Sequence, residues 1–141
     1  MKKNSTTHQT IIGIDLGDKK HAICVLGNDG EVLKEFDIRN EREELQRLVR
    51  EHPKARVVME VGTHSPWISR LFSAAGLDVI VANARKLRAI YDNERKCDRT
   101  DARMLARIGR MDPAMLHPVR HIGEEGQRDL LLLKLRDTLV R

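Results

Sequence analysis

The sequence predicts an α/β fold: a mixed five-stranded sheet flanked by helices and followed by a basic helical segment. Residues 10–17 form an apolar, mostly β-branched stretch, which is typical of a strand buried on both faces. Two further strand patterns follow, joined by the tight-turn signal Asn28-Asp29-Gly30. Helical patterns then alternate with two more short apolar stretches. A helix between two strands favours parallel pairing through a right-handed crossover.

The residues up to 51 predict an antiparallel meander and a helix. Residues 21–26 predict the second strand. Residues 31–38 alternate approximately between apolar and polar side chains, which favours an edge strand with one wet face. Asn40 has the character of an N-cap, and Glu43 stands three residues later, where a capping box needs it. We therefore expect a helix over residues 41–51.

The next part of the chain predicts two strands around a helix. Residues 55–60 predict a short fourth strand that ends in a carboxylate. Ser65 and Pro66 predict the N-cap and the first position of a second helix, and Gly76 predicts its C-terminal cap. Residues 77–82 predict the fifth strand. Helical patterns follow over residues 84–90, 100–111 and 128–141.

The composition indicates one soluble domain. The chain has 141 residues, of which 40% are apolar and 33% are charged. It has no apolar run near the roughly 18 residues of a membrane span, and its N-terminus has no signal-peptide pattern. Cys24 lies in a predicted strand and one other cysteine is present. This usage favours a reducing, cytoplasmic location over a disulfide framework.

Four carboxylates stand at the ends of predicted elements. Asp15 ends the first strand and Glu60 ends the fourth, so parallel pairing of these strands places both at the same edge of the sheet. Carboxylates that close repel each other unless one is protonated or a cation lies between them. Asp101 lies on the apolar stripe of the helix over residues 100–111, and Asp98 lies on the same side if the helix begins earlier. Because hard cations prefer oxygen ligands, the four predict a site for Mg²⁺ or Mn²⁺.

A structural role for each of these carboxylates stays open. Asp98 also suits a helix cap, and Asp101 also suits a place near the positive end of the helix dipole. The two strand-end carboxylates also suit positions beside loops. His64 and Trp67 follow Glu60 and are candidates to line the site, although Trp67 better suits a place in the core.

The ordered set Asp15, Glu60 and Asp98-x-x-Asp101 resembles the DEDD motif of one class of insertion-sequence transposases. In that class, the motif belongs to a RuvC-like domain of the RNase H fold. The class includes bridge-RNA-guided recombinases and Piv-like DNA invertases. The resemblance covers nearly the whole chain, and Cys97 departs from it, since the family often has a small polar residue there. Further segments similar to the family are residues 60–64, 81–86 and 96–102.

The resemblance implies an enzyme of DNA transposition and recombination that acts on phosphodiester bonds. It implies that the four carboxylates are the catalytic residues and the metal ligands. It also implies a RuvC-like domain over residues 1–111 and the start of a helical linker or oligomerisation segment over residues 112–141. The expected partners are DNA, a structured guide RNA and further copies of the chain, as a dimer or tetramer.

Members of the family resemble two-part enzymes in which a C-terminal domain supplies a nucleophilic serine. We expect that domain to be absent from these 141 residues and the chain alone to be inactive in recombination. Ser65, Ser69 and Ser73 lie on a predicted helix and are better explained as cap and surface residues.

Positive charge is concentrated in the last part of the chain. Residues 1–84 carry equal numbers of basic and acidic residues, so the net charge of +5 lies in residues 85–141. A basic region beside a neutral domain favours an anionic partner such as nucleic acid, and a solvated helical surface explains it equally well. With only four aromatic residues, base stacking is not the main binding device. The candidates for phosphate contacts are Arg85, Lys86, Arg88, Arg95, Lys96, Arg99, Arg103, Arg107 and Arg110.

Two other functions fit parts of the sequence. An actin-like-fold ATPase or sugar kinase also begins with a strand like residues 12–17 followed by a strand, a tight turn and another strand. Such proteins need a second lobe and further glycine-rich phosphate loops, and residues 85–141 offer neither. A non-catalytic assembly module that pairs subunits through its leucine-rich tail is the third interpretation. ATP binding favours the kinase, whereas Mg²⁺-dependent binding of structured RNA or branched DNA favours the transposase.

Overall fold

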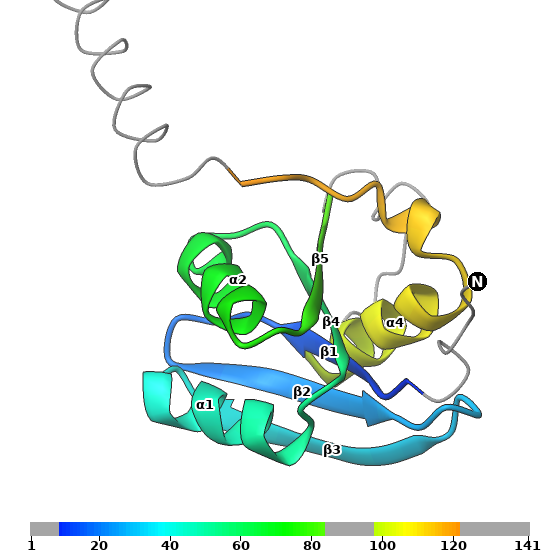
Figure 1. Ribbon diagram of the computed structural model, residues 1–141, viewed down its shortest axis with the longest axis horizontal. Coiled ribbons are helices and arrows are strands. Elements are labelled where there is room, and N and C mark those ends of the chain that lie inside the picture. The colour runs from blue at the N-terminus through cyan, green and yellow to red at the C-terminus, as the bar shows by residue number, and fades with distance from the viewer. Residues whose placement is uncertain (1–8, 84–97, 122–141) are drawn as a thin grey trace, which may run out of the picture.

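The computed structural model describes residues 9–83 and 98–121, with side chains in the second range from Ala102 onward. Figure 1 shows a twisted sheet with helices on both faces. The strand order is β3-β2-β1-β4-β5; β1 pairs antiparallel with β2, and β4 pairs parallel with β1 and β5. The strands are β1 (Ile11–Asp15), β2 (Lys20–Leu26), β3 (Val32–Arg39), β4 (Arg56–Glu60) and β5 (Asp78–Ala82). The predicted mixed five-stranded α/β sheet is confirmed.

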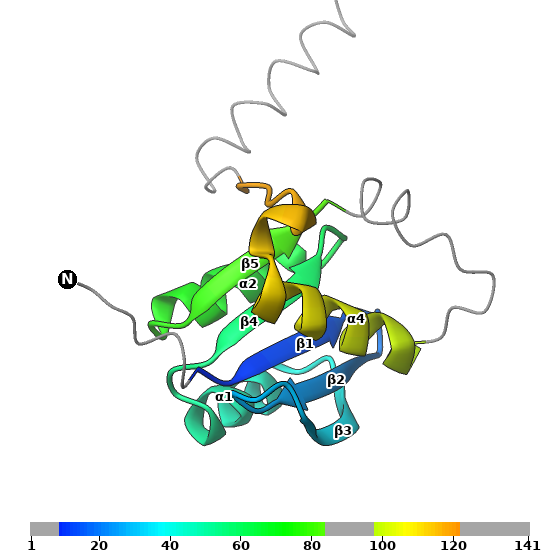
Figure 2. The ribbon, with the colours of Figure 1, turned by 90° about the vertical axis from the view of Figure 1, so that its right-hand side faces the viewer.

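Helices pack on both faces of this sheet. Helices α1 and α2 lie on one face, and α4 crosses the other, as Figures 1 and 2 show. A short 3-10 helix, η2, follows α4 and places Leu116 in the core. The bounds are α1 (Arg42–Glu51), α2 (Ser65–Ala74), α4 (Asp98–Met111) and η2 (Pro113–Leu116). The predicted segments 84–90 and 128–141 lie outside the described residues.

Two apolar clusters, one on each face, explain why the first strand is apolar on both sides. Ile12 and Ile14 belong to a cluster with the inner stripes of α1 and α2. Ile11 belongs to the other cluster, which includes Leu105 and Ile108 of α4. Side chains alternate between faces along a strand, so β1 contributes to both cores. Burial of β1 on both faces holds the end of this strand in a fixed place.

Two expected caps differ from the structure. Glu41 is the N-cap of α1 and makes no side-chain capping bond, so the predicted capping box at Asn40 is wrong. His64 is the N-cap of α2, and Ser65 is already helical and buried. The Ser65 hydroxyl donates to the carbonyl oxygen of Gly62 at 2.9 Å, so this serine stabilises the preceding turn instead. Ser69 is also buried, contrary to the expected surface position.

Cys24 lies in β2 as a free, buried cysteine. Burial raises the pKa of its thiol to about 11, and the nearby carboxylate of Glu35 adds to the rise. The thiol is therefore protonated at neutral pH and packs as a small apolar side chain. Within the described part of the chain, no helix has the length and apolar character needed to cross a membrane.

Candidate active site

Two of the predicted ligands end neighbouring parallel strands. Asp15 is the last residue of β1, and Glu60 is the last residue of β4. The last paired residues before them are Ile14 and Met59, so both carboxylates leave the sheet at the same edge. Both residues are half-buried. The structure therefore brings together two acidic residues that are far apart in the sequence.

Helix α4 packs directly on β1 because β1 has a glycine beneath it. A Cβ built at Gly13 would collide with the backbone carbonyl of Ala102 and would lie 2.8 Å from the backbone nitrogen of Ala106. Further along the helix, a Cβ at Gly109 would lie 3.8 Å from Ile11 Cγ2. The helix therefore runs antiparallel to β1, with its first turn toward the carboxyl end of the strand (Figure 2).

This packing sets the level of the first turn of α4. A helix rises about 1.5 Å per residue, so Asp98 lies about 6 Å along the helix axis before Ala102. A strand rises about 3.3 Å per residue, so Asp15 lies about 7 Å beyond Gly13. The backbone of Asp98 thus stands near the level of the end of β1, and that of Asp101 stands about one helical turn short of it. The side chains of these two residues lie outside the described ones.

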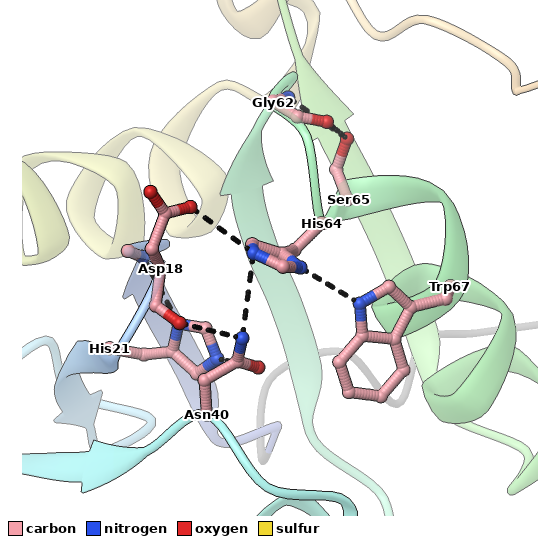
Figure 3. Close-up of polar contacts among 8 residues, drawn as sticks. Asp18, His21, Asn40, Gly62, His64, Ser65 and Trp67 are labelled. Carbon is pink, nitrogen blue, oxygen red and sulfur yellow. Dashed lines mark hydrogen bonds and ion pairs between the residues drawn. The ribbon is translucent and has the colours of Figure 1, made fainter.

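A polar network orders the loops that follow these strand ends (Figure 3). The backbone N–H of Gly17 donates to His21 Nδ1 at 3.1 Å. The proton of this ring therefore resides on Nε2, which donates to Asn40 Oδ1 at 3.0 Å. The Asn40 amide in turn donates to the carbonyl oxygen of Asp18 at 3.0 Å. Asn40, expected as a helix cap, instead ties the loop after β1 to the end of β3.

His64 joins the second loop to the first. The Trp67 indole Nε1 donates to His64 Nδ1 at 3.1 Å, which leaves the proton of the ring on Nε2. That proton points to Asp18 Oδ1 at 3.2 Å (Figure 3). Trp67 also packs against the core, and the guanidinium of Arg42 lies 5.9 Å from its ring centre. The network joins the loops after β1 and β4, which directly follow Asp15 and Glu60.

Burial of His21 predicts a pH dependence of stability. Burial lowers its pKa from 6.5, the nearby His64 lowers it further, and the hydrogen bond to Asn40 opposes both. Below pH 6.5 the unfolded state binds more protons than the folded state, so the free energy of unfolding falls as pH decreases through the folded pKa. Urea unfolding between pH 7.5 and pH 5 measures this loss.

The matched variant for this measurement is His21→Leu, which does not titrate. We expect its free energy of unfolding to depend less on pH than that of the wild type over the same range. His52 and His121 also have lowered pKa values and contribute pH dependence of the same sign in both proteins. An equal pH dependence in the variant would show that His21 is not neutral in the fold.

The structure describes three of the predicted phosphate-contact residues, all on α4. Arg103 forms two parallel hydrogen bonds to Glu35, each 2.7 Å long. Arg110 donates from Nε and Nη2 to the carbonyl oxygen of Asn28, at the opposite edge of the sheet from the carboxylates. Arg107 is exposed. The other six lie outside the described residues or, for Arg99, have no described side chain.

One basic residue has a structural role that the sequence pattern did not indicate. Arg56 Nε donates to Asp78 Oδ2 at 2.7 Å, and Nη1 donates to the carbonyl oxygen of Gly109 at 2.9 Å. This side chain therefore links β4, β5 and the end of α4. Its role depends on α4 crossing the sheet, which no local pattern encodes.

Comparison with known proteins identifies the family. A family model described as a transposase, of the DEDD type from IS110 elements, matches residues 12–141. The chain belongs to this DEDD transposase family. The family resemblance expected from the acidic motif is therefore confirmed, and the ATPase interpretation of the opening strand is not supported. Among curated proteins, none matches the chain significantly.

Solved structures place this DEDD transposase in the RuvC-like fold. It is similar to Thermus thermophilus RuvC in complex with its Holliday junction substrate, with a TM-score of 0.50 and 14% identity over 75% of this chain and 98% of that chain. A second Thermus thermophilus RuvC structure gives a TM-score of 0.48 and 14% identity over 74% and 97%. At this identity the likeness concerns the fold.

The described side chains of the transposase do not themselves complete a metal-binding cluster. Among them, no group of three or more His, Cys, Asp or Glu residues is close enough to hold an ion. Asp15 and Glu60 supply two carboxylates, and Asp98 and Asp101 belong to the helix turn that approaches them.

Proposed function

We propose that this chain is the metal-binding catalytic domain of a DNA transposase that acts as a recombinase. The proposal rests on the convergence of three secondary-structure elements. The carboxyl ends of β1 and β4 lie side by side, and the first turn of α4 lies toward the carboxyl end of β1. Each contributes acidic residues of the motif. Asp15, Glu60, Asp98 and Asp101 are then the ligands of Mg²⁺ or Mn²⁺.

The chemistry of the donor set fits a hard divalent cation. All four side chains are carboxylates, which are preferred ligands of Mg²⁺ and Mn²⁺. The half-buried side chain of Glu60 makes no hydrogen bond or ion pair with another described residue, so no described residue competes with a ligand for its oxygens. A divalent ion held there supplies Lewis-acid stabilisation of charge on a phosphoryl oxygen.

The remaining parts of the proposal concern partners. The substrate is DNA, bound together with a structured guide RNA, and the working assembly contains several copies of the chain. A nucleophilic serine comes from a C-terminal domain outside these 141 residues, so the isolated chain binds metal and nucleic acid without recombining DNA. Residues 112–141 begin the connection toward that domain, and the first of them, around η2 and Val119, also pack on the sheet.

Mn²⁺ titration tests the proposed site. We expect Asp15→Asn and Glu60→Gln each to weaken Mn²⁺ binding by at least about tenfold, because each removes an anionic ligand. The matched control is Asp29→Asn, which removes a carboxylate from the turn at the opposite edge of the sheet. Electron paramagnetic resonance of free Mn²⁺ measures the affinity. Unchanged affinity in Asp15→Asn, or an equal loss in Asp29→Asn, would contradict the proposal.

A further inference from the structure

A groove outside the carboxylate site runs along the β5 edge of the sheet. Its volume is about 570 Å³. Helix α2 forms one wall, and the segment after η2 forms the other. The residues that line it are Ser69, Arg70, Ser73, Val79, Val81, Pro118, Val119, Arg120 and His121.

Backbone pairing holds the second wall in place. The N–H of Asn83 donates to the carbonyl oxygen of Leu116 at 3.0 Å, and the N–H of Val119 donates to that of Val81 at 2.8 Å. The segment therefore runs antiparallel to β5 and extends the sheet by a short stretch. Figure 1 shows this segment, in orange, passing over β5 toward α2. Both walls of the groove are therefore held in place by the fold.

The groove is positively charged. Arg70 and Arg120 are exposed, and neither makes an ion pair or a hydrogen bond within the described part of the chain. Among the described residues that line the groove, none is acidic. By contrast, Arg56 and Arg103 are each paired with a carboxylate. No described residue therefore competes with an anionic ligand for these two arginines.

Polar groups accompany this charge. His121 has a buried Nε2 atom with no hydrogen-bond partner among the described residues. Burial lowers the pKa of His121, and the positive charge of Arg70, which lines the same groove, lowers it further. The Ser73 side chain lies in an exposed position on the α2 wall. Guanidinium and hydroxyl groups are common donors to phosphate oxygens.

One end of the groove lies at the carboxyl end of β5. Val81 lines it, and the next residue of β5, Ala82, pairs with Glu60. From there the groove descends along β5 past Val79. Because successive side chains of a strand point to opposite faces, the groove lies on the α2 face of the sheet, whereas Glu60, in phase with Val58, points to the α4 face.

We propose that this groove binds the sugar-phosphate backbone of the DNA outside the carboxylate site, with Arg70 and Arg120 as the principal phosphate contacts. This inference rests on the proposed function. It places phosphate binding on α2 and on the segment after η2, whereas the sequence pattern placed it between residues 85 and 110. Arg70 lies in the part of the chain with balanced charge, so net charge did not indicate it.

The test compares DNA affinity in metal-free buffer with EDTA. The double variant Arg70→Gln/Arg120→Gln removes two phosphate contacts. In a plot of the logarithm of affinity against the logarithm of salt concentration, the slope for this variant should then be about two units less steep than for the wild type. Between 50 and 200 mM salt, wild-type affinity should therefore fall about tenfold more than that of the variant. Fluorescence anisotropy with short labelled duplex and single-stranded DNA measures both.

The matched control is Arg50→Gln/Lys54→Gln, which removes the same charge from exposed positions at the end of α1 and just after it. We expect the control to keep the wild-type slope and both variants to keep the wild-type melting temperature by circular dichroism. A wild-type slope in the groove variant, or an equal loss in both variants, would overturn the inference.

Failure of this inference is distinguishable from failure of the proposed function. The Mn²⁺ titration of Asp15→Asn tests the proposed function alone, because it contains no DNA, and the DNA titration of the groove variant tests the groove alone, because EDTA removes the metal. A groove variant that binds both Mn²⁺ and DNA like the wild type would show that the groove does not bind DNA, and it would leave the proposed metal site unaffected.

Discussion

Gly13→Ala is expected to lower the free energy of unfolding by about 3 kcal/mol, the upper part of the usual range for overpacking. The added Cβ meets the carbonyl of Ala102 and the backbone nitrogen of Ala106. Both obstacles are backbone atoms of α4, so no side-chain rotamer change relieves the clash. The helix must move away from β1, which opens the core around Leu105. Urea denaturation measures the loss.

Gly62→Ala is the matched control. A Cβ at Gly62 meets nothing within 4 Å, and its φ does not lie in the region that favours glycine. We expect its free energy of unfolding to stay within about 0.5 kcal/mol of the wild type, as for most surface substitutions. Equal stability of the two variants would show that α4 does not press on β1 at this point.

Gly13→Ala also tests whether the packing of α4 on β1 supports the proposed metal site. If α4 moves outward at Ala102, the backbone of Asp98 and Asp101 moves with it, away from the end of β1. We therefore expect Mn²⁺ affinity to fall in Gly13→Ala under conditions in which circular dichroism shows the variant folded. A folded variant with wild-type Mn²⁺ affinity would place the metal ligands elsewhere.

The elements of the fold were predictable because their signals are local. A continuous apolar stretch predicted β1 as a strand buried on both faces. A tight-turn sequence predicted the connection of β2 to β3, and apolar periodicity predicted the helices. The positions of Asp15 and Glu60 at strand ends followed from the same patterns, together with the handedness of the crossover. These features depend on residues near one another in the chain.

Features that depend on packing between distant segments were not predictable in this way. Asn40 has the local signature of a helix cap, yet its side chain bonds His21 and the loop after β1. Its side chain bonds the buried ring of His21 and leaves the first turn of α1 without a side-chain cap. Arg70 and Arg120 meet in one groove only because the chain after η2 returns along β5. Nothing in the sequence around either arginine encodes that return.

His21→Leu is expected to destabilise the protein by about 2 kcal/mol, because it leaves two polar groups without partners. The ring of His21 is fully buried, accepts from the N–H of Gly17 and donates to Asn40. Leucine fills a similar space and offers neither bond. The loop after β1 loses its anchor, so amide hydrogen exchange around Gly17 should also become faster. Thermal and urea unfolding measure the first effect.

His52→Leu, the same substitution at another histidine, should raise the free energy of unfolding or leave it unchanged. The Nε2 atom of His52 is buried and has no hydrogen-bond partner among the described residues, and burial lowers the pKa of the ring. Leucine there removes an unpaired polar atom, which is neutral or stabilising. A loss at His52 equal to that at His21 would mean that packing volume, and not the hydrogen bonds of the network, determines the cost. Opposite outcomes at the two sites would show that the network itself holds the loop beside Asp15 in place.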